Sequence, residues 1–130
     1  MLSFRTLKTN FMQKRILVLD DNKNVLEAMR EALTYSDYEV KTVEHISNIF
    51  DLIDDFHPDL LLLDYLLWET TGAEICHQIK SNAETANLPV VIISPYPCIN
   101  EPVVTRNCDA VLSKPFNLVE LLGTVNKFVN

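Results

Sequence analysis

The stretch Pro58-Asp59-Leu60-Leu61-Leu62-Leu63-Asp64 holds four consecutive leucines between a proline-led entry and an aspartate. The run is too short for a helix and a proline punctuates its start, so we expect a strand. A strand without polar alternation has both faces covered, which is typical of a parallel sheet with helices on each side. Asp64 then lies at the carboxyl end of that strand, where open α/β sheets bind their ligands. It is either the N-cap of a helix or a reactive centre, and we favour the reactive centre.

Apolar runs and amphipathic stripes alternate along the rest of the chain. We expect further strands over residues 16–19, 38–43, 90–93 and 110–112. The helical stripes between and after them are Val25, Leu26, Met29 and Leu33; Ile46, Ile49, Phe50 and Ile53; Ala73, Ile75, Cys76 and Ile79, beginning near Gly72; and Leu118, Leu121, Leu122, Val125 and Val129, opened by an Asn117–Glu120 capping box. Prolines after Ser94 oppose a regular helix, so the fourth helix should be short or irregular. Five alternations predict an α/β fold with a doubly wound, five-stranded parallel sheet and helices on both faces.

Composition narrows the function classes. The chain has 130 residues, 48% of them apolar, and a formal net charge of −7. These values are typical of one globular domain, and the acidic balance argues against direct nucleic-acid binding. No apolar run is long enough to cross a membrane, and residues 1–13 lack the features of a signal peptide. We expect residues 1–13 to be a lead-in, open to disorder, before a single domain over residues 14–130.

Glycine and cysteine usage excludes several kinds of site. With only two glycines, Gly72 and Gly123, the chain has neither a P-loop nor a dinucleotide fingerprint. The three cysteines, Cys76, Cys98 and Cys108, form no CxxC pair. We therefore expect neither a disulfide framework nor a zinc site, and a reducing, cytoplasmic compartment fits best.

Five side chains that can bind a metal or take part in a reaction lie at or just after the carboxyl ends of predicted strands: Asp20, Asp21, Asp64, Ser94 and Lys114. Parallel strands bring such ends to one edge of a sheet, so we expect these groups to meet. Three converging carboxylates repel one another unless a cation joins them, and Mg²⁺ suits hard oxygen ligands. One carboxylate could then attack phosphorus, while an ammonium and the metal offset the charge on the phosphoryl group.

Each of these residues also has an ordinary explanation. Asp21 or Asn22 could cap the first helix, and Asp64 could cap a later one. Lys114 taken alone could be a solvated charge, and Ser94 a loop hydroxyl. The conjunction of all five at strand ends favours the site.

At this point the chain resembles the receiver domains of two-component response regulators, from about residue 14 to residue 130. The motifs that carry the resemblance are ILVLDDN over residues 16–22, LLLLD over residues 60–64 with Gly72 downstream, VIIS over residues 91–94 and LSKPF over residues 112–116. The resemblance implies a flavodoxin-like fold. It also implies that Asp64 accepts a phosphoryl group from a phosphohistidine of a sensor histidine kinase or phosphotransfer protein, so the chain would be a regulatory switch and not an enzyme.

The resemblance also implies the other roles. Mg²⁺ would be bound by Asp20, Asp21, Asp64 and the backbone carbonyl of Leu66. Ser94 would turn towards the phosphoryl group, and Lys114 would pair with it. The peptide bond between Lys114 and its following proline is expected to be cis.

Several positions depart from the family pattern. Val111 stands where an aromatic ring usually moves inward, and we interpret it as strand core. Pro95 has no N–H to offer the phosphoryl group, which removes a charge-assisted hydrogen bond of ~1.5–3 kcal/mol. Trp68 is either a lid or a packing residue, with packing favoured. Leu66 and Tyr96 are bulky where side chains flank the phosphoryl group, which would slow attack by water.

These departures leave other functions open. An interaction module that keeps the acids without switching is the main alternative, motivated by Val111 and Pro95. A flavodoxin-like cofactor binder and a phosphatase are further alternatives that the sequence favours less. Family members commonly dimerise through the fourth helix, and a shortened helix puts that mode of dimerisation in doubt. The candidate partners are an unidentified downstream protein and a second copy of this chain. We interpret His45, His57 and His77, which do not cluster with the acids, as surface or helix residues and not as phosphodonors or ligands.

Overall fold

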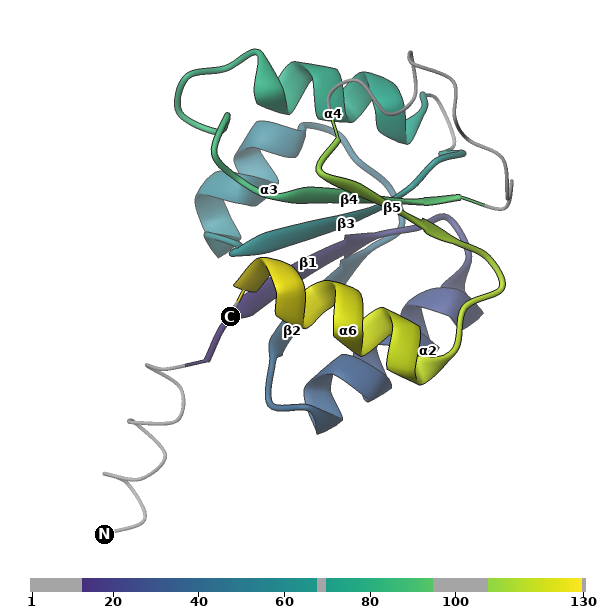
Figure 1. The fold of residues 1–130 in the computed structure, drawn as a ribbon. Helices are drawn as coiled ribbons and strands as arrows, with labels where there is room; N and C mark the ends of the chain where they lie inside the picture. The colour runs from purple at the N-terminus through teal and green to yellow at the C-terminus, as the bar shows by residue number, and fades with distance from the viewer. Residues whose placement is uncertain (1–12, 68–69, 95–107, 130) are drawn as a thin grey trace, which may run out of the picture.

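In the part of the chain that the structure describes, one parallel sheet lies between two pairs of helices (Figure 1). The computed structural model describes residues 13–67, 70–94 and 108–129. The strands and helices are, in chain order, β1 (Arg15–Leu19), α2 (Lys23–Tyr35), β2 (Glu39–Val43), α3 (Ile49–Phe56), β3 (Leu60–Asp64), α4 (Gly72–Lys80), β4 (Val90–Ser94), β5 (Ala110–Ser113) and α6 (Leu118–Val129). The predicted α/β class and five-stranded parallel sheet are therefore confirmed.

The sheet has the strand order β2-β1-β3-β4-β5, with every neighbouring pair parallel. The chain builds outward from β1 to β2, then crosses back to β3 on the other side of β1. This reversal makes the crevice outside the carboxyl ends of β1 and β3 the expected ligand position of an open α/β sheet.

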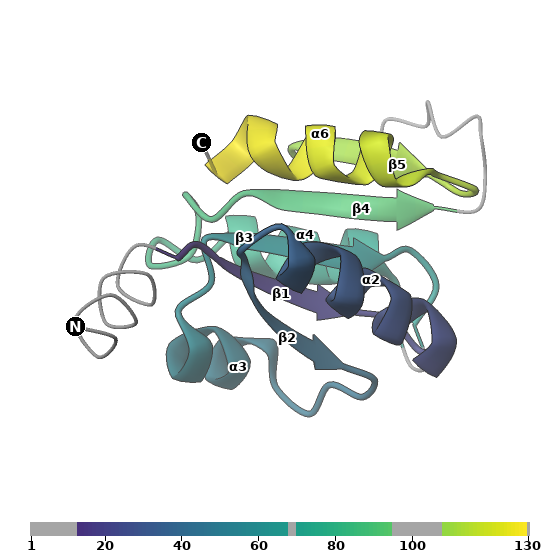
Figure 2. The same ribbon diagram turned by 90° about the horizontal axis from the view of Figure 1, so that it is seen from below.

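The four leucines of β3 show why a continuous apolar run was needed. Leu60 and Leu62 join the core under α2 and α6, whereas Leu61 and Leu63 join the core under α3 and α4. Figure 1 shows the two helix layers on opposite sides of the sheet, and Figure 2 views the sheet from the side of α2 and α6. All four leucines are fully buried, and burying each side chain contributes about 1.5–3 kcal/mol. The central strands therefore hold both layers at once.

Polar side chains set most helix starts. Asn48 accepts hydrogen bonds from the backbone N–H groups of Phe50 and Asp51, so α3 begins at Ile49. The expectation that Ile46 belongs to this helix was wrong, since Ile46 packs against the core from the preceding loop. The capping box before α6 is confirmed: the N–H of Asn117 donates to Glu120 Oε1 at 3.3 Å, and the N–H of Glu120 donates to Asn117 Oδ1 at 2.8 Å.

One further expectation is corrected by the structure, and two lie outside the residues that it describes. β2 begins one residue later than predicted, after the buried Tyr38. The irregular fourth helix and all but the last residue of the predicted lead-in over residues 1–13 lie outside the described residues. Among the helices that are described, none is long and apolar enough to cross a membrane.

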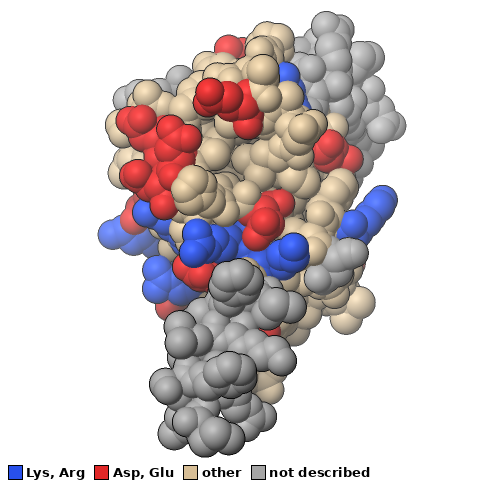
Figure 3. All heavy atoms as spheres, turned by 90° about the vertical axis from the view of Figure 1, so that its left-hand side faces the viewer, with Lys and Arg blue, Asp and Glu red and all other residues tan. Residues whose placement is uncertain are grey.

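The amino ends of the strands form a face where charges of both signs mix. Figure 3 views the molecule from this side, and Lys and Arg side chains lie there beside Asp and Glu side chains. Arg15 pairs with Glu39 on this face, with Nε 3.3 Å from Oε1. The acids predicted to act together lie at the opposite ends of the strands.

Candidate functional site

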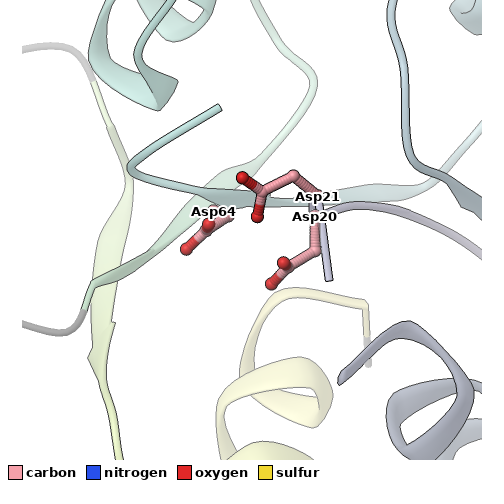
Figure 4. A group of neighbouring side chains, drawn as sticks. All are labelled: Asp20, Asp21 and Asp64. Carbon is pink, nitrogen blue, oxygen red and sulfur yellow. The ribbon is translucent and has the colours of Figure 1, made fainter. Parts of the chain in front are cut away.

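Two neighbouring strands bring the predicted acids together. Leu19 of β1 pairs with Leu63 of β3, so the residues that follow, Asp20 and Asp64, emerge side by side. One carboxylate oxygen each from Asp20, Asp21 and Asp64 lies within 4.8 Å of the others (Figure 4). In the described part of the chain, no other group of three or more His, Cys, Asp or Glu side chains is arranged in this way. Asp20 is 1% exposed and Asp64 is 5% exposed, whereas Asp21 is only partly buried, so the cluster opens to water on the side of Asp21.

Other residues cap the helices and leave these acids available. Asn22 caps α2, because its Oδ1 accepts from the N–H groups of residues 24 and 25 at 2.9 and 3.2 Å. Thr71 caps α4 by accepting from the N–H of residue 74 at 3.1 Å. Asp20 accepts one hydrogen bond from the N–H of Asn22 at 2.9 Å. The alternatives in which Asp21 caps the first helix and Asp64 caps a later one are therefore not what the structure shows.

Lys114 reaches the same cluster from the loop after β5. Its Nζ lies 3.4 Å from Asp20 Oδ2 and 3.3 Å from Asp64 Oδ1. The Lys114–Pro115 peptide bond is cis, as expected. The N–H of Lys114 donates to the carbonyl of Ser94 at 2.7 Å, which ties the loop to the end of β4.

Ser94 and Leu66 flank the cluster. Ser94 is the last residue of β4 and is fully buried, and its strand neighbour Ile93 pairs with Asp64. Leu66 follows β3 by two residues, forms an isolated bridge with Thr71, and is 45% exposed. The structure therefore places both residues next to the acids in the sheet and its loop.

The electrostatics of the cluster are unbalanced. Burial, together with the neighbouring charge of Asp20, raises the pKa of Asp64 to about 6, although Lys114 acts in the opposite direction. Burial also raises the pKa of Asp20. One ammonium faces three carboxylates, so a further cation would relieve their repulsion. The donor set is oxygen only and converges from two adjacent loops, which fits Mg²⁺.

The three histidines lie apart from the cluster, on exposed positions. His57 ends α3 with a left-handed backbone at φ 53°. Val111 is partly buried in β5 and pairs with Ile92 of β4, as expected for a strand residue. The expectations for Trp68, Pro95 and Tyr96 fall outside the described residues.

Sequence reasoning quoted Gly72 only as part of a motif and missed its contact with Asp64. A Cβ atom at residue 72 would lie 2.7 Å from the backbone oxygen of Asp64. The available signal was the position itself: one of only two glycines in the chain stands at the start of a helix, eight residues after the central acid.

Comparison with known proteins agrees with this geometry. Residues 16–126 match the family described as the response regulator receiver domain. Response regulator MprA from Mycobacterium sp. (strain KMS) is 34% identical over 114 residues, which cover 86% of this chain and 49% of the relative. MprA from Mycobacterium bovis (strain BCG / Pasteur 1173P2) gives the same values. The chain thus spans about half the length of the curated relatives it matches.

Solved structures show the same architecture. The response regulator TrrA from Thermotoga maritima, in complex with Mg²⁺-BeF, superposes with a TM-score of 0.80 at 27% identity, covering 89% of this chain and 99% of that one. A putative response regulator from Chloroflexus aurantiacus gives a TM-score of 0.82 at 24% identity, covering 90% and 98%, and supports the fold.

The family match extends over most of the chain, from the first strand into the last helix. The sheet order, the acid cluster and the structural neighbours agree with it. The chain therefore belongs to the receiver domain family of two-component response regulators.

Proposed function

We propose that this chain is a phosphoacceptor signalling switch, built over residues 14–130, in which Asp64 accepts a phosphoryl group. The donor is a phosphohistidine of a sensor histidine kinase or of a phosphotransfer protein. The observation that carries the proposal is the geometry around Asp64. Its carboxylate lies at the carboxyl end of the central strand, with two further acids within 4.8 Å and the Lys114 ammonium at 3.3 Å.

In this proposal Asp20, Asp21, Asp64 and the backbone carbonyl of Leu66 hold Mg²⁺. The convergence of three carboxylates supports this, and so does the relative TrrA, whose structure contains Mg²⁺-BeF. When bound, the metal supplies positive charge that offsets the charge on the transferring phosphoryl oxygens.

The transfer itself is a displacement at phosphorus. A carboxylate oxygen of Asp64 forms the new bond to phosphorus while the bond from phosphorus to the imidazole nitrogen breaks, and its electron pair stays on that nitrogen. With a pKa of about 6, Asp64 is mostly ionised at neutral pH and needs no base. Lys114 then exchanges its contact with Asp64 for a phosphoryl oxygen, and the Ser94 hydroxyl donates a hydrogen bond to another.

The output is a change in protein contacts. Because the Asp64 carboxylate is already ionised, its conversion to an acyl phosphate of about −2 adds about one negative charge at the carboxyl ends of the strands, which biases the segments that carry Ser94 and Lys114. The downstream partner is another protein or a second copy of this chain. A second candidate, an interaction module that does not switch, is favoured by Val111, whose short side chain is already partly buried and has no ring to move.

Intact-mass spectrometry after incubation with acetyl phosphate and Mg²⁺ tests the proposal. We expect the wild type to gain the mass of one phosphoryl group, and to lose this gain with EDTA or in Asp64→Asn. Asp54→Asn is the matched control, because Asp54 is an exposed acid on α3. Equal modification of Asp64→Asn would refute Asp64 as the acceptor, and an unmodified wild type would favour the interaction module.

A further inference from the structure

The loop between β3 and α4 folds back onto the backbone of Asp64, and Gly72 is the residue that touches it. The N–H of Gly72 donates to the carbonyl of Tyr65 at 2.8 Å. The N–H of Tyr65 in turn donates to the carbonyl of Ile93 in β4 at 2.8 Å. Within the loop, Leu66 pairs with Thr71. The first residue of α4 is therefore held directly against the last residue of β3.

This approach leaves no room for a side chain at position 72. A Cβ atom would lie 2.7 Å from the carbonyl oxygen of Asp64, 3.3 Å from the Cα of Tyr65 and 3.4 Å from the carbonyl carbon of Asp64. All three atoms belong to the backbone, so no side-chain rotation can relieve the contact. Gly72 itself is buried.

Neither partner in the contact is free to move alone. Asp64 is fixed within the sheet, since its strand pairs with β1 on one side and β4 on the other. α4 is fixed by the side chains that it buries against the sheet, among them Ile75 and Ile79. Relief of an added methyl group must therefore shift both sides of the contact, and the segment from Asp64 to Leu66, which carries the proposed metal ligands, moves with them.

We propose that Gly72 is a positioning residue for the phosphoacceptor site, an inference that rests on the proposed function. By lacking a side chain it lets the loop close tightly, and this closure sets where the Asp64 carboxylate and the Leu66 carbonyl stand relative to Asp20 and Asp21. Gly72 touches no reacting atom, and it acts through the backbone of Asp64.

The chain offers a matched control in its other glycine. Gly123 lies in α6, and a Cβ atom there would meet nothing within 4 Å. Gly72→Ala and Gly123→Ala thus make the same chemical change in two helices, one beside the site and one remote from it.

The test measures two properties of each variant against the wild type: Mg²⁺ affinity, by isothermal titration calorimetry, and stability, by urea unfolding. Changes in residues that orient metal ligands typically weaken affinity by about 10–100-fold, and we expect a loss of at least about tenfold in Gly72→Ala. Its rate of phosphorylation by acetyl phosphate should fall as well. Gly123→Ala should match the wild type in Mg²⁺ affinity and in phosphorylation rate, and its stability in urea should be equal or higher, because alanine is favoured over glycine inside helices.

A double variant separates an effect on stability from an effect on the positioning of the metal ligands. The double variant Gly72→Ala, Gly123→Ala regains helix stability from the second substitution, because alanine is favoured over glycine inside helices. We expect it to fold and still bind Mg²⁺ weakly. Wild-type affinity in a destabilised Gly72→Ala, or a double variant that fails to fold at all, would overturn the inference and make Gly72 a packing residue.

The outcomes also separate this inference from the proposed function. A wild type that binds Mg²⁺ but accepts no phosphoryl group would refute the proposed function. A weaker Mg²⁺ affinity in Gly72→Ala would still support the placement of Asp64 by Gly72 in that case.

Discussion

Lys80 forms a clamp at the end of the sheet away from the acids. Its ammonium donates to the carbonyls of Leu88 at 2.7 Å and Ala86 at 3.2 Å, and it lies 2.8 Å from Asp109 Oδ2. Asp109 in turn accepts from the N–H of Val90 at 2.7 Å. The clamp thus joins the end of α4, the loop that follows it, and the starts of β4 and β5.

Replacing Lys80 by methionine keeps most of the length of the side chain and removes the ammonium. A hydrogen bond to a charged group contributes ~1.5–3 kcal/mol, whereas a fully exposed ion pair contributes ~0–1 kcal/mol. The side chain of Lys80 is 18% exposed and that of Asp109 is 35% exposed, so the clamp lies between these cases. Asp109 also keeps its bond from Val90. We expect Lys80→Met to lower the free energy of unfolding by about 2–3 kcal/mol.

Lys23→Met is the matched control. The Nζ of Lys23 lies 3.9 Å from Glu44 Oε1, and its side chain is 81% exposed. The same chemical change should cost less than about 0.5 kcal/mol there. Urea unfolding followed by circular dichroism measures both variants, and with a slope of roughly 1.5–2 kcal/mol/M the midpoint of Lys80→Met should fall by about 1–2 M.

Mg²⁺ affinity should be unchanged in Lys80→Met, because the clamp and the acids lie at opposite strand ends. The reasoning would be refuted if Lys80→Met and Lys23→Met lost the same small amount of stability. That result would mean that solvent replaces the three contacts of Lys80 without net cost.

Three further predictions concern the acids, a helix cap and a buried thiol. Burial and the charge of Asp20 raise the pKa of Asp64 to about 6, so the folded protein holds this proton more tightly than the unfolded chain. The free energy of unfolding of the metal-free protein should therefore fall as the pH rises from about 4 to about 7, and it should fall less in Asp64→Asn. Urea titrations in the presence of EDTA measure both proteins, and parallel pH profiles would contradict this prediction. Asn22→Ala removes the N-cap of α2 and should cost about 1 kcal/mol in the same urea assay, and unchanged stability would show that water caps the helix equally well. Burial raises the pKa of Cys76 to about 12, so its thiol should stay unalkylated by iodoacetamide at neutral pH in the native protein and react after unfolding in urea. Peptide mapping that finds Cys76 labelled quickly in the native state would count against its burial.

The sheet could be predicted from sequence because its central strands are buried on both faces. The apolar runs at residues 16–19, 60–63 and 90–93 lie within β1, β3 and β4, whose apolar side chains are almost entirely buried. Helix starts were harder, as Ile46 shows. Its spacing fits the stripe of α3, but periodicity does not register that the Asn48 side chain satisfies the first N–H groups of that helix.

The set of acids was predictable because parallel strands end at one edge. Asp20 and Asp64 had only to follow adjacent strands to become neighbours. The choice between Asp21 and Asn22 as the helix cap was not predictable, since both residue types cap helices well. The contact between Gly72 and Asp64 and the clamp of Lys80 depend on distances between elements, which a linear pattern does not contain.

The two ends of the sheet differ in how their charges are balanced, and this contrast supports a metal site at one of them. At the amino ends, Arg15 pairs with Glu39 and Lys80 pairs with Asp109, so these two cations each have one carboxylate. At the carboxyl ends, the single ammonium of Lys114 faces three carboxylates from two loops. Charged side chains that serve only solubility or stability are expected to pair one cation with one carboxylate. The second arrangement carries a cost that a divalent cation would remove, and this supports the proposed metal site.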